Sequence, residues 1–111
     1  MNTAMENITV DFARNAEQYW SHIARADSKS ANAVNRENEK LVAALVKQGK
    51  AKLVLSPLLH NSSSKVRLAA AAALIKSDGL EEARTVLVEL AEDPAELIKQ
   101  SARAVLRCYA K

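Results

Sequence analysis

The side chains best suited to chemistry in this chain are two histidines, His22 and His60, and the serine run from Ser62 to Ser64. His60 and this run offer a base beside a hydroxyl. A nucleophile also needs a group that orients the base and N–H donors for an oxyanion, and the nearby sequence supplies neither. The histidines also lack the short paired spacing of metal-ligand motifs. We therefore expect both to be partly exposed residues at helix ends.

Other kinds of catalytic site have as little basis in the sequence. Only two glycines occur, Gly49 and Gly79, so a glycine-rich phosphate loop cannot be drawn. The single cysteine, Cys108, stands near the end of an apolar helical stripe, which indicates simple packing. Solvation and the positive end of a helix account for the carboxylates of the 89–96 segment. We expect no enzymatic activity, no cofactor and no metal ion.

The composition favours a small helical protein. Of the 111 residues, 49% are hydrophobic and only 4% aromatic, so the interior must consist of alanine, leucine and valine, which suits closely packed helices better than a sheet sandwich. The length is that of one domain, 1–111. Neither a secretory apolar segment nor a run of about 18 apolar residues occurs, so we expect a cytoplasmic protein without a membrane partner.

The charge is unevenly distributed along the chain. The net charge is +3, and residues 50–79 alone carry five basic side chains against one acidic, while the flanking segments are nearly balanced. A locally polarised surface of this kind favours a protein partner over a phosphate backbone.

Six helices in three pairs are predicted. Thr9 is the expected N-terminal cap of the first helix, which should end at 25–27, and Gly49 suits the end of the second. Pro57 predicts a bend or a late start in the third helix, 51–60, because an interior proline removes a backbone hydrogen bond. The fourth helix should follow the 61–64 caps and run to about residue 77, and the fifth should span 80–92. The sixth should begin with a capping box at 93–96 and reach Tyr109.

A segment of the chain reappears after 32 residues. Leu55 to Asn61 corresponds to 87–93, and the register continues through Val66 and Ile98 to Ala70 and Ala102. Such a period in an alanine-rich chain is typical of stacked helical hairpins, in which each hairpin is too small to bury its own face. We interpret 1–49 as a leading helix pair, 50–78 as a first repeat and 79–111 as a second. A binding scaffold is then favoured over an enzyme.

The repeat resembles a known family. The series Leu58-Leu59-His60-Asn61, Val66-Arg67-Leu68-Ala69-Ala70 and Ala73-Leu74 is similar to the HEAT repeat. Nearly the whole chain also resembles small bacterial HEAT-like domains of unknown function, through Phe12, Ala16, Asn35-Arg36 and the helix end at 45–49. The resemblance implies a short right-handed α-solenoid. It also implies a ladder in which Arg67 meets the turn aspartate Asp93, the alternative being that Arg67 faces a ligand.

The function that this resemblance implies is protein binding without catalysis. Small HEAT-like proteins of this kind occur beside secreted bacterial toxins as immunity proteins, which implies a protein that binds and neutralises one cognate toxin. Nucleic-acid binding is the alternative partner class, although acidic residues interrupt any basic track. A housekeeping adaptor or a regulatory subunit is a further alternative.

Helical geometry indicates where a partner would bind. Leu68 and Ile75 lie on the face of the fourth helix opposite Val66 and Ala70, and they are either covered by neighbouring hairpins or exposed on a concave floor. Trp20, next to Tyr19, is either a core-edge residue or an exposed anchor. The equivalent faces of the second and sixth helices carry charged and polar residues. The predicted partner-binding surface comprises Arg36, Glu39, Lys40, Leu68, Ile75, Gln100, Arg103 and Arg107.

Overall fold

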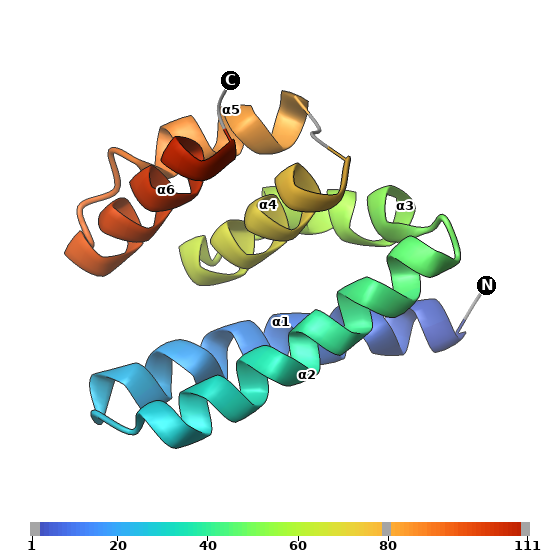
Figure 1. Cartoon of the computed structure of the whole chain (residues 1–111), viewed down its shortest axis with the longest axis horizontal. Helices are drawn as coiled ribbons and strands as arrows, with labels where there is room; N and C mark the ends of the chain where they lie inside the picture. Colours follow the sequence, from blue (N-terminus) through green and yellow to red (C-terminus); the bar gives the residue numbers. More distant parts are fainter. Residues whose placement is uncertain (1–2, 79–80, 110–111) are drawn as a thin grey trace. The chain divides into compact units, whose positions relative to one another are not determined.

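The computed structural model describes residues 3–78 and 81–109, and within these ranges the chain is helical without any strand (Figure 1). The predicted all-α class with six helices is confirmed, and one 3-10 helix is added; the solenoid arrangement stays a prediction. The elements are α1 (Thr3–Ala24), α2 (Ser28–Lys47), α3 (Ala51–Leu55), η1 (Ser56–His60), α4 (Ser64–Asp78), α5 (Glu81–Leu90) and α6 (Glu96–Tyr109).

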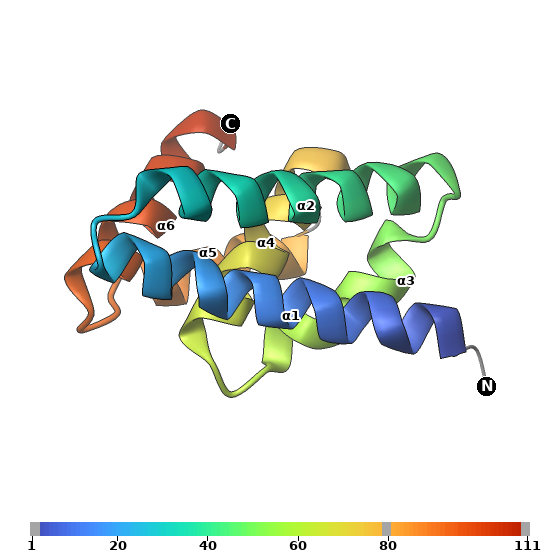
Figure 2. The same cartoon turned by 90° about the horizontal axis from the view of Figure 1, so that it is seen from below.

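The chain forms two compact units, Met1–Val54 and Leu55–Lys111, and the division falls inside α3. In the N-terminal unit, α1 and α2 lie side by side as an antiparallel hairpin (Figure 2). In the C-terminal unit, α4 packs against η1, α5 and α6, and α5 also packs against α6.

Two helix boundaries show how local sequence sets the elements. The break after α3 is confirmed at Pro57, which lies in the first turn of η1, where its missing N–H costs nothing. The predicted cap at Thr9 is wrong, because α1 begins at Thr3 and Thr9 lies inside it. The segment before Thr9 contains no glycine or proline that would stop the helix. The predicted turn at Gly79 and helix start at Leu80 lie outside the described residues.

Five positions of the C-terminal unit are buried in both copies of the repeat. Val66 and Ile98 are 2% and 3% exposed, so the two residues on which the 32-residue register depends share the same kind of environment. Burial of these pairs agrees with the repeat register, and the division into two structural repeats stays a prediction. The buried pairs in this unit are Leu55 and Leu87, Leu58 and Leu90, Leu59 and Ala91, Val66 and Ile98, and Ala70 and Ala102.

The two ends of the helical hairpin in the N-terminal unit are closed by the same backbone motif. After α1, the N–H of Asp27 donates to the carbonyl of His22 at 2.8 Å and the N–H of Ala26 donates to Ile23 at 3.0 Å. After α2, Lys50 donates to Leu45 at 2.8 Å and Gly49 donates to Val46 at 3.0 Å. Both are Schellman motifs, which place one residue in the left-handed region. That residue is Ala26 in one motif (φ 60°) and Gly49 in the other (φ 69°).

These two motifs predict opposite effects of exchanging alanine and glycine. Ala26→Gly should raise the free energy of unfolding by roughly 0.5–1 kcal/mol, because glycine adopts a positive φ without a Cβ clash. Gly49→Ala should lower it by about 1 kcal/mol through backbone conformation alone, since an added Cβ there meets no atom within 4 Å. Urea unfolding of both variants measures the two shifts, and shifts of the same sign would contradict the assignment.

A buried polar contact joins the two helices of the hairpin. The amide Nδ2 of Asn15 donates to Oδ1 of Asn38 at 3.0 Å, and Nδ2 of Asn38 donates to the carbonyl of Phe12 at 3.1 Å. Both asparagines are buried, and no buried side-chain nitrogen or oxygen within the described ranges lacks a partner. Asn38 stands midway between the buried Ala31 and Leu45 at seven-residue spacing, a position where asparagine fixes the register of paired helices.

Removal of one partner of this pair should cost more than removal of both. Asn38→Leu leaves the amide of Asn15 buried without its acceptor, so we expect a loss of about 1–3 kcal/mol in the free energy of unfolding. The double variant Asn15→Leu/Asn38→Leu should recover most of that loss, because no unsatisfied polar group remains. Denaturant unfolding of both variants tests this, and a double variant that is less stable than Asn38→Leu would refute the argument.

Candidate partner-binding surface

The loops that lead into α4 and α6 have the same hydrogen bonds, 32 residues apart. Oδ1 of Asn61 accepts from the N–H of Ser63 at 2.9 Å, and Oδ1 of Asp93 accepts from the N–H of Ala95 at 2.8 Å. The N–H groups of Asn61 and Asp93 donate to the carbonyls of residues 58 and 90. Both loops are therefore Asx turns, in which a short side chain closes the turn onto its own backbone.

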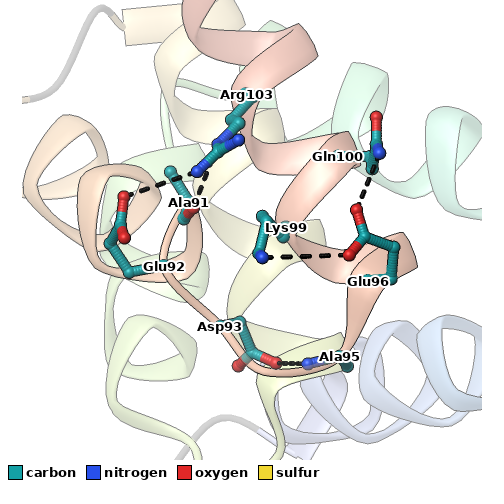
Figure 3. A network of polar contacts seen from close by, with 8 residues as sticks. All are labelled: Ala91, Glu92, Asp93, Ala95, Glu96, Lys99, Gln100 and Arg103. Atoms are coloured by element: carbon teal, nitrogen blue, oxygen red, sulfur yellow. Dashed lines mark hydrogen bonds and ion pairs between the residues drawn. The ribbon is translucent and has the colours of Figure 1, made fainter.

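The Asx turn at Asp93 replaces the predicted capping box. α6 begins at Glu96, so Pro94 lies in the bend before the helix and not at its first position. The carboxylate of Glu96 contacts residues further along α6, Lys99 at 3.8 Å and Gln100 at 2.8 Å (Figure 3). The box is not completed because the Asp93 N–H, from which Glu96 would accept, donates to the carbonyl of Leu90.

The predicted ladder between Arg67 and Asp93 is not formed. Nη1 of Arg67 donates to the carbonyl of Asn61 at 2.7 Å, and the Asp93 carboxylate accepts from the Ala95 amide. No ion pair joins the two residues, both of which lie within the described part of the chain. The alternative, in which Arg67 faces a ligand, is not what this contact indicates either: Arg67 is half-buried and holds the end of η1 to the start of α4.

In the second hairpin an arginine also donates to a carbonyl that follows the first helix, but both the arginine and the carbonyl stand at other positions of the repeat. Lys99 is the repeat equivalent of Arg67, but Arg103, one helical turn further along, reaches back across the loop (Figure 3). Nε of Arg103 donates to the carbonyl of Ala91 at 3.1 Å, and its Nη2 lies 3.6 Å from Oε2 of Glu92. Arg103, predicted to bind a partner, therefore has a structural contact of its own.

The apolar centre of the predicted surface is not exposed. Leu68 and Ile75 are each 6% exposed, so the first of the two readings, burial, holds, and neither offers area to a partner. The prediction that they belong to an exposed partner-binding surface was therefore wrong. The physical reason is that α4 contacts three other elements of its unit and carries aliphatic residues around most of its circumference.

The remaining predicted surface residues are all exposed, three on each unit. Arg36, Glu39 and Lys40 share the outward face of α2, and Lys40 makes a 3.9 Å ion pair with Glu37. On α6 the repeat equivalents of buried apolar residues on α4 are exposed and polar. The pairs are Leu68 and Gln100, Ala71 and Arg103, and Ile75 and Arg107.

The titratable residues singled out in the sequence lie in surface contacts. His60, at the end of η1, pairs through Nε2 with Oε2 of Glu82 on α5 at 2.9 Å. His22, near the end of α1, contacts Nη2 of Arg25 at 2.8 Å. Hydrogen bonds from Ser30, followed by smaller attraction from nearby cationic groups, hold the pKa of Asp27 below its ordinary value of 3.8. Within the described ranges, no three His, Cys, Asp or Glu side chains gather where they would hold a metal ion.

Two other predictions about single residues are settled by exposure. Cys108 is exposed, so its expected packing was wrong: ten residues after Ile98, it is turned about 80° from the buried side of α6. Trp20 and Tyr19 are both half-buried, with their rings edge to face at 5.2 Å, which makes Trp20 a core-edge residue.

No helix in the part of the chain that the structure describes is long and apolar enough to cross a bilayer.

Substitution by alanine at the equivalent positions 67 and 99 should lower the free energy of unfolding by unequal amounts. Arg67→Ala removes a charge-assisted bond to a backbone carbonyl and should lower the free energy of unfolding by about 1–2 kcal/mol. Lys99→Ala removes only an ion pair to a largely exposed Glu96 and should cost less than about 0.5 kcal/mol. Denaturant unfolding of the two variants gives both values, and equal losses would show that the Arg67 contact does not stabilise the hairpin.

The sequence was also compared with protein-family models, with curated proteins and with solved structures, and none of the three comparisons found a match. The features that bear on function are therefore the geometry and charge of α6, together with the sequence motif that resembles the HEAT repeat.

Proposed function

We propose that this protein is a non-catalytic protein-interaction module and, more specifically, an immunity protein that binds and neutralises one cognate bacterial toxin. The observation that carries the proposal is the contrast between α4 and α6. Their inward positions repeat, while the outward positions change from buried leucine, alanine and isoleucine to exposed glutamine and arginine. The toxin itself is suggested by the resemblance to small HEAT-like immunity proteins.

The exposed residues of α6 have the chemistry of an interface. Arginine is enriched at protein interfaces and at their energetic hot spots, because one side chain offers both apolar area and several hydrogen-bond donors. Arg107 is exposed, and no ion-pair partner for it occurs among the described residues. Its removal should therefore weaken partner binding more than it lowers the stability of the fold. Removal of Arg103 would change both, because Arg103 also donates to the loop carbonyl of Ala91.

The proposal predicts that binding and stability can be separated at Gln100 and Arg107. The test protein is the product of the gene adjacent to this one, which is assayed for toxicity and then co-expressed and purified with the chain. The double variant Gln100→Ala/Arg107→Ala should raise the Kd for that toxin at least tenfold, which is about 1.4 kcal/mol, and should reduce rescue of growth. Its melting temperature should stay within a degree or two, because both residues are exposed.

A matched control is Lys76→Ala, an exposed cationic position on α4 of the same unit. It should leave the Kd for the toxin and the growth rescue unchanged. A neighbouring toxin that neither co-purifies nor is neutralised would overturn the proposal. Binding of DNA that weakens steeply with salt, and that Lys76→Ala also weakens, would support nucleic-acid binding in its place.

A further inference from the structure

The outward side of α6 divides lengthwise into two strips. At about 100° per residue, Leu97, Ala104 and Cys108 lie within one narrow strip, and Gln100 and the two arginines lie beside it. Leu97 is 56% exposed, Cys108 is exposed and Ala104 is half-buried. An exposed leucine at this position is not required by the interior, which Ile98 and Ala102 already fill from the other side of the helix.

The same two strips of α4 have the opposite character. The repeat equivalents of Leu97 and Cys108 are Lys65 and Lys76, whereas the equivalents of the polar strip are buried apolar residues. At two of the three positions of each strip, apolar and basic residues have therefore changed places between the two helices, while Ala104 matches Ala72 and Gln100 replaces Leu68. If no further element covers the outer side of α6, polar residues at 100, 103 and 107 are expected there. The absence of a covering element does not explain why α6 has Leu97 and Cys108 at positions where α4 has lysines.

The charge of this face selects the kind of partner. α6 carries three cations, Lys99, Arg103 and Arg107, and one carboxylate, that of its first residue Glu96. Lys99 is paired with Glu96 and Arg103 with Glu92, so Arg107 is the cation beside the apolar strip that has no ion-pair partner in the described ranges. A phosphate backbone would gain nothing from Leu97, whereas a protein segment with carboxylates beside apolar side chains matches both strips.

We propose that the outer face of α6, formed by Leu97, Ala104 and Arg107, docks an acidic amphipathic helix of the partner, with its apolar side on Leu97 and a carboxylate on Arg107. This inference rests on the proposed function for the identity of the partner. The chemistry of the docked segment follows from α6 itself.

Cys108 supplies a direct readout of this docking, because it is the only cysteine, is exposed, and lies in the apolar strip. One arm of the experiment uses the toxic product of the adjacent gene. The other uses a synthetic amphipathic helical peptide with a leucine face and a glutamate face, with a matched peptide that carries lysine in place of glutamate. Reaction of Cys108 with a maleimide is timed with and without each probe.

We expect the toxin and the glutamate peptide to slow the reaction of Cys108 at least several-fold, and the lysine peptide to leave it unchanged. Arg107→Glu should raise the Kd for the glutamate peptide tenfold or more and shift the preference towards the lysine peptide. Leu97→Ser should weaken both the peptide and the toxin. Lys76→Glu is the matched charge reversal on α4 and should change neither Kd.

The two proposals fail differently in this experiment. A toxin that binds while Cys108 reacts at its free rate would overturn docking at α6 and leave the immunity function standing. A glutamate peptide that protects Cys108 when no toxin binds would support the docking chemistry and remove the immunity function. Equal protection by both peptides would overturn the charge argument. If protection of Cys108 increases with the concentration of this protein in the absence of any probe, and sedimentation shows a dimer, a second copy occupies the face. That result would overturn the docking of a partner helix.

Discussion

The C-terminal unit depends on alanine at the positions where its helices approach one another. Ala70 on α4, Ala83 on α5 and Ala102 on α6 have no exposed surface, and these three helices contact one another in pairs. A larger side chain at any of these positions would have to move a neighbouring helix, because protein interiors have no spare volume. This requirement explains why Ala70 and Ala102 match across the repeat. The size of an inward-facing side chain is limited by the packing of the helices. The residue type at an outward-facing position is limited only by the surface that lies next to it.

A second constraint acts on the backbone at the end of each hairpin's first helix, and it is satisfied by different residues in the two copies. The carbonyls of Asn61 and Ala91 lie just beyond the ends of η1 and α5, where no following turn supplies a donor. Arg67 reaches the first at 2.7 Å and Arg103 reaches the second at 3.1 Å. An alignment of the repeats by residue type makes the second copy look incomplete, since it has Lys99 in place of the arginine. A related contact is nevertheless present, because Arg103, one turn further along, donates to the carbonyl of Ala91, although the repeat equivalent of Ala91 is Leu59 and not Asn61.

Sequence reasoning succeeded where a residue restricts its own backbone and failed where the restriction lies in a contact. Pro57 ends α3, and Gly49 follows α2, because φ preferences are properties of the residue. Ala26 adopts the same left-handed conformation as Gly49, but its residue type gives no sign of this. The Asn15–Asn38 pair was missed for a related reason: an asparagine on a helix is usually placed on the solvated face, and only the seven-residue spacing from Ala31 to Leu45 marks Asn38 as inward.

The same distinction limits what the sequence says about the candidate surface. α4 is apolar around most of its circumference, so its sequence permitted both a buried and an exposed Leu68, and only the packing decides. α6 has a clearly divided pattern, and its polar face could be assigned correctly from spacing. In a repeat protein, the packing of the interior selects the same residue types at equivalent inward positions of both copies. A surface position whose residue differs between the copies is not set by this packing, and Leu97 at such a position is the residue on which the proposed docking rests. The difference between copies is thus a better guide to a binding face than the repeat itself.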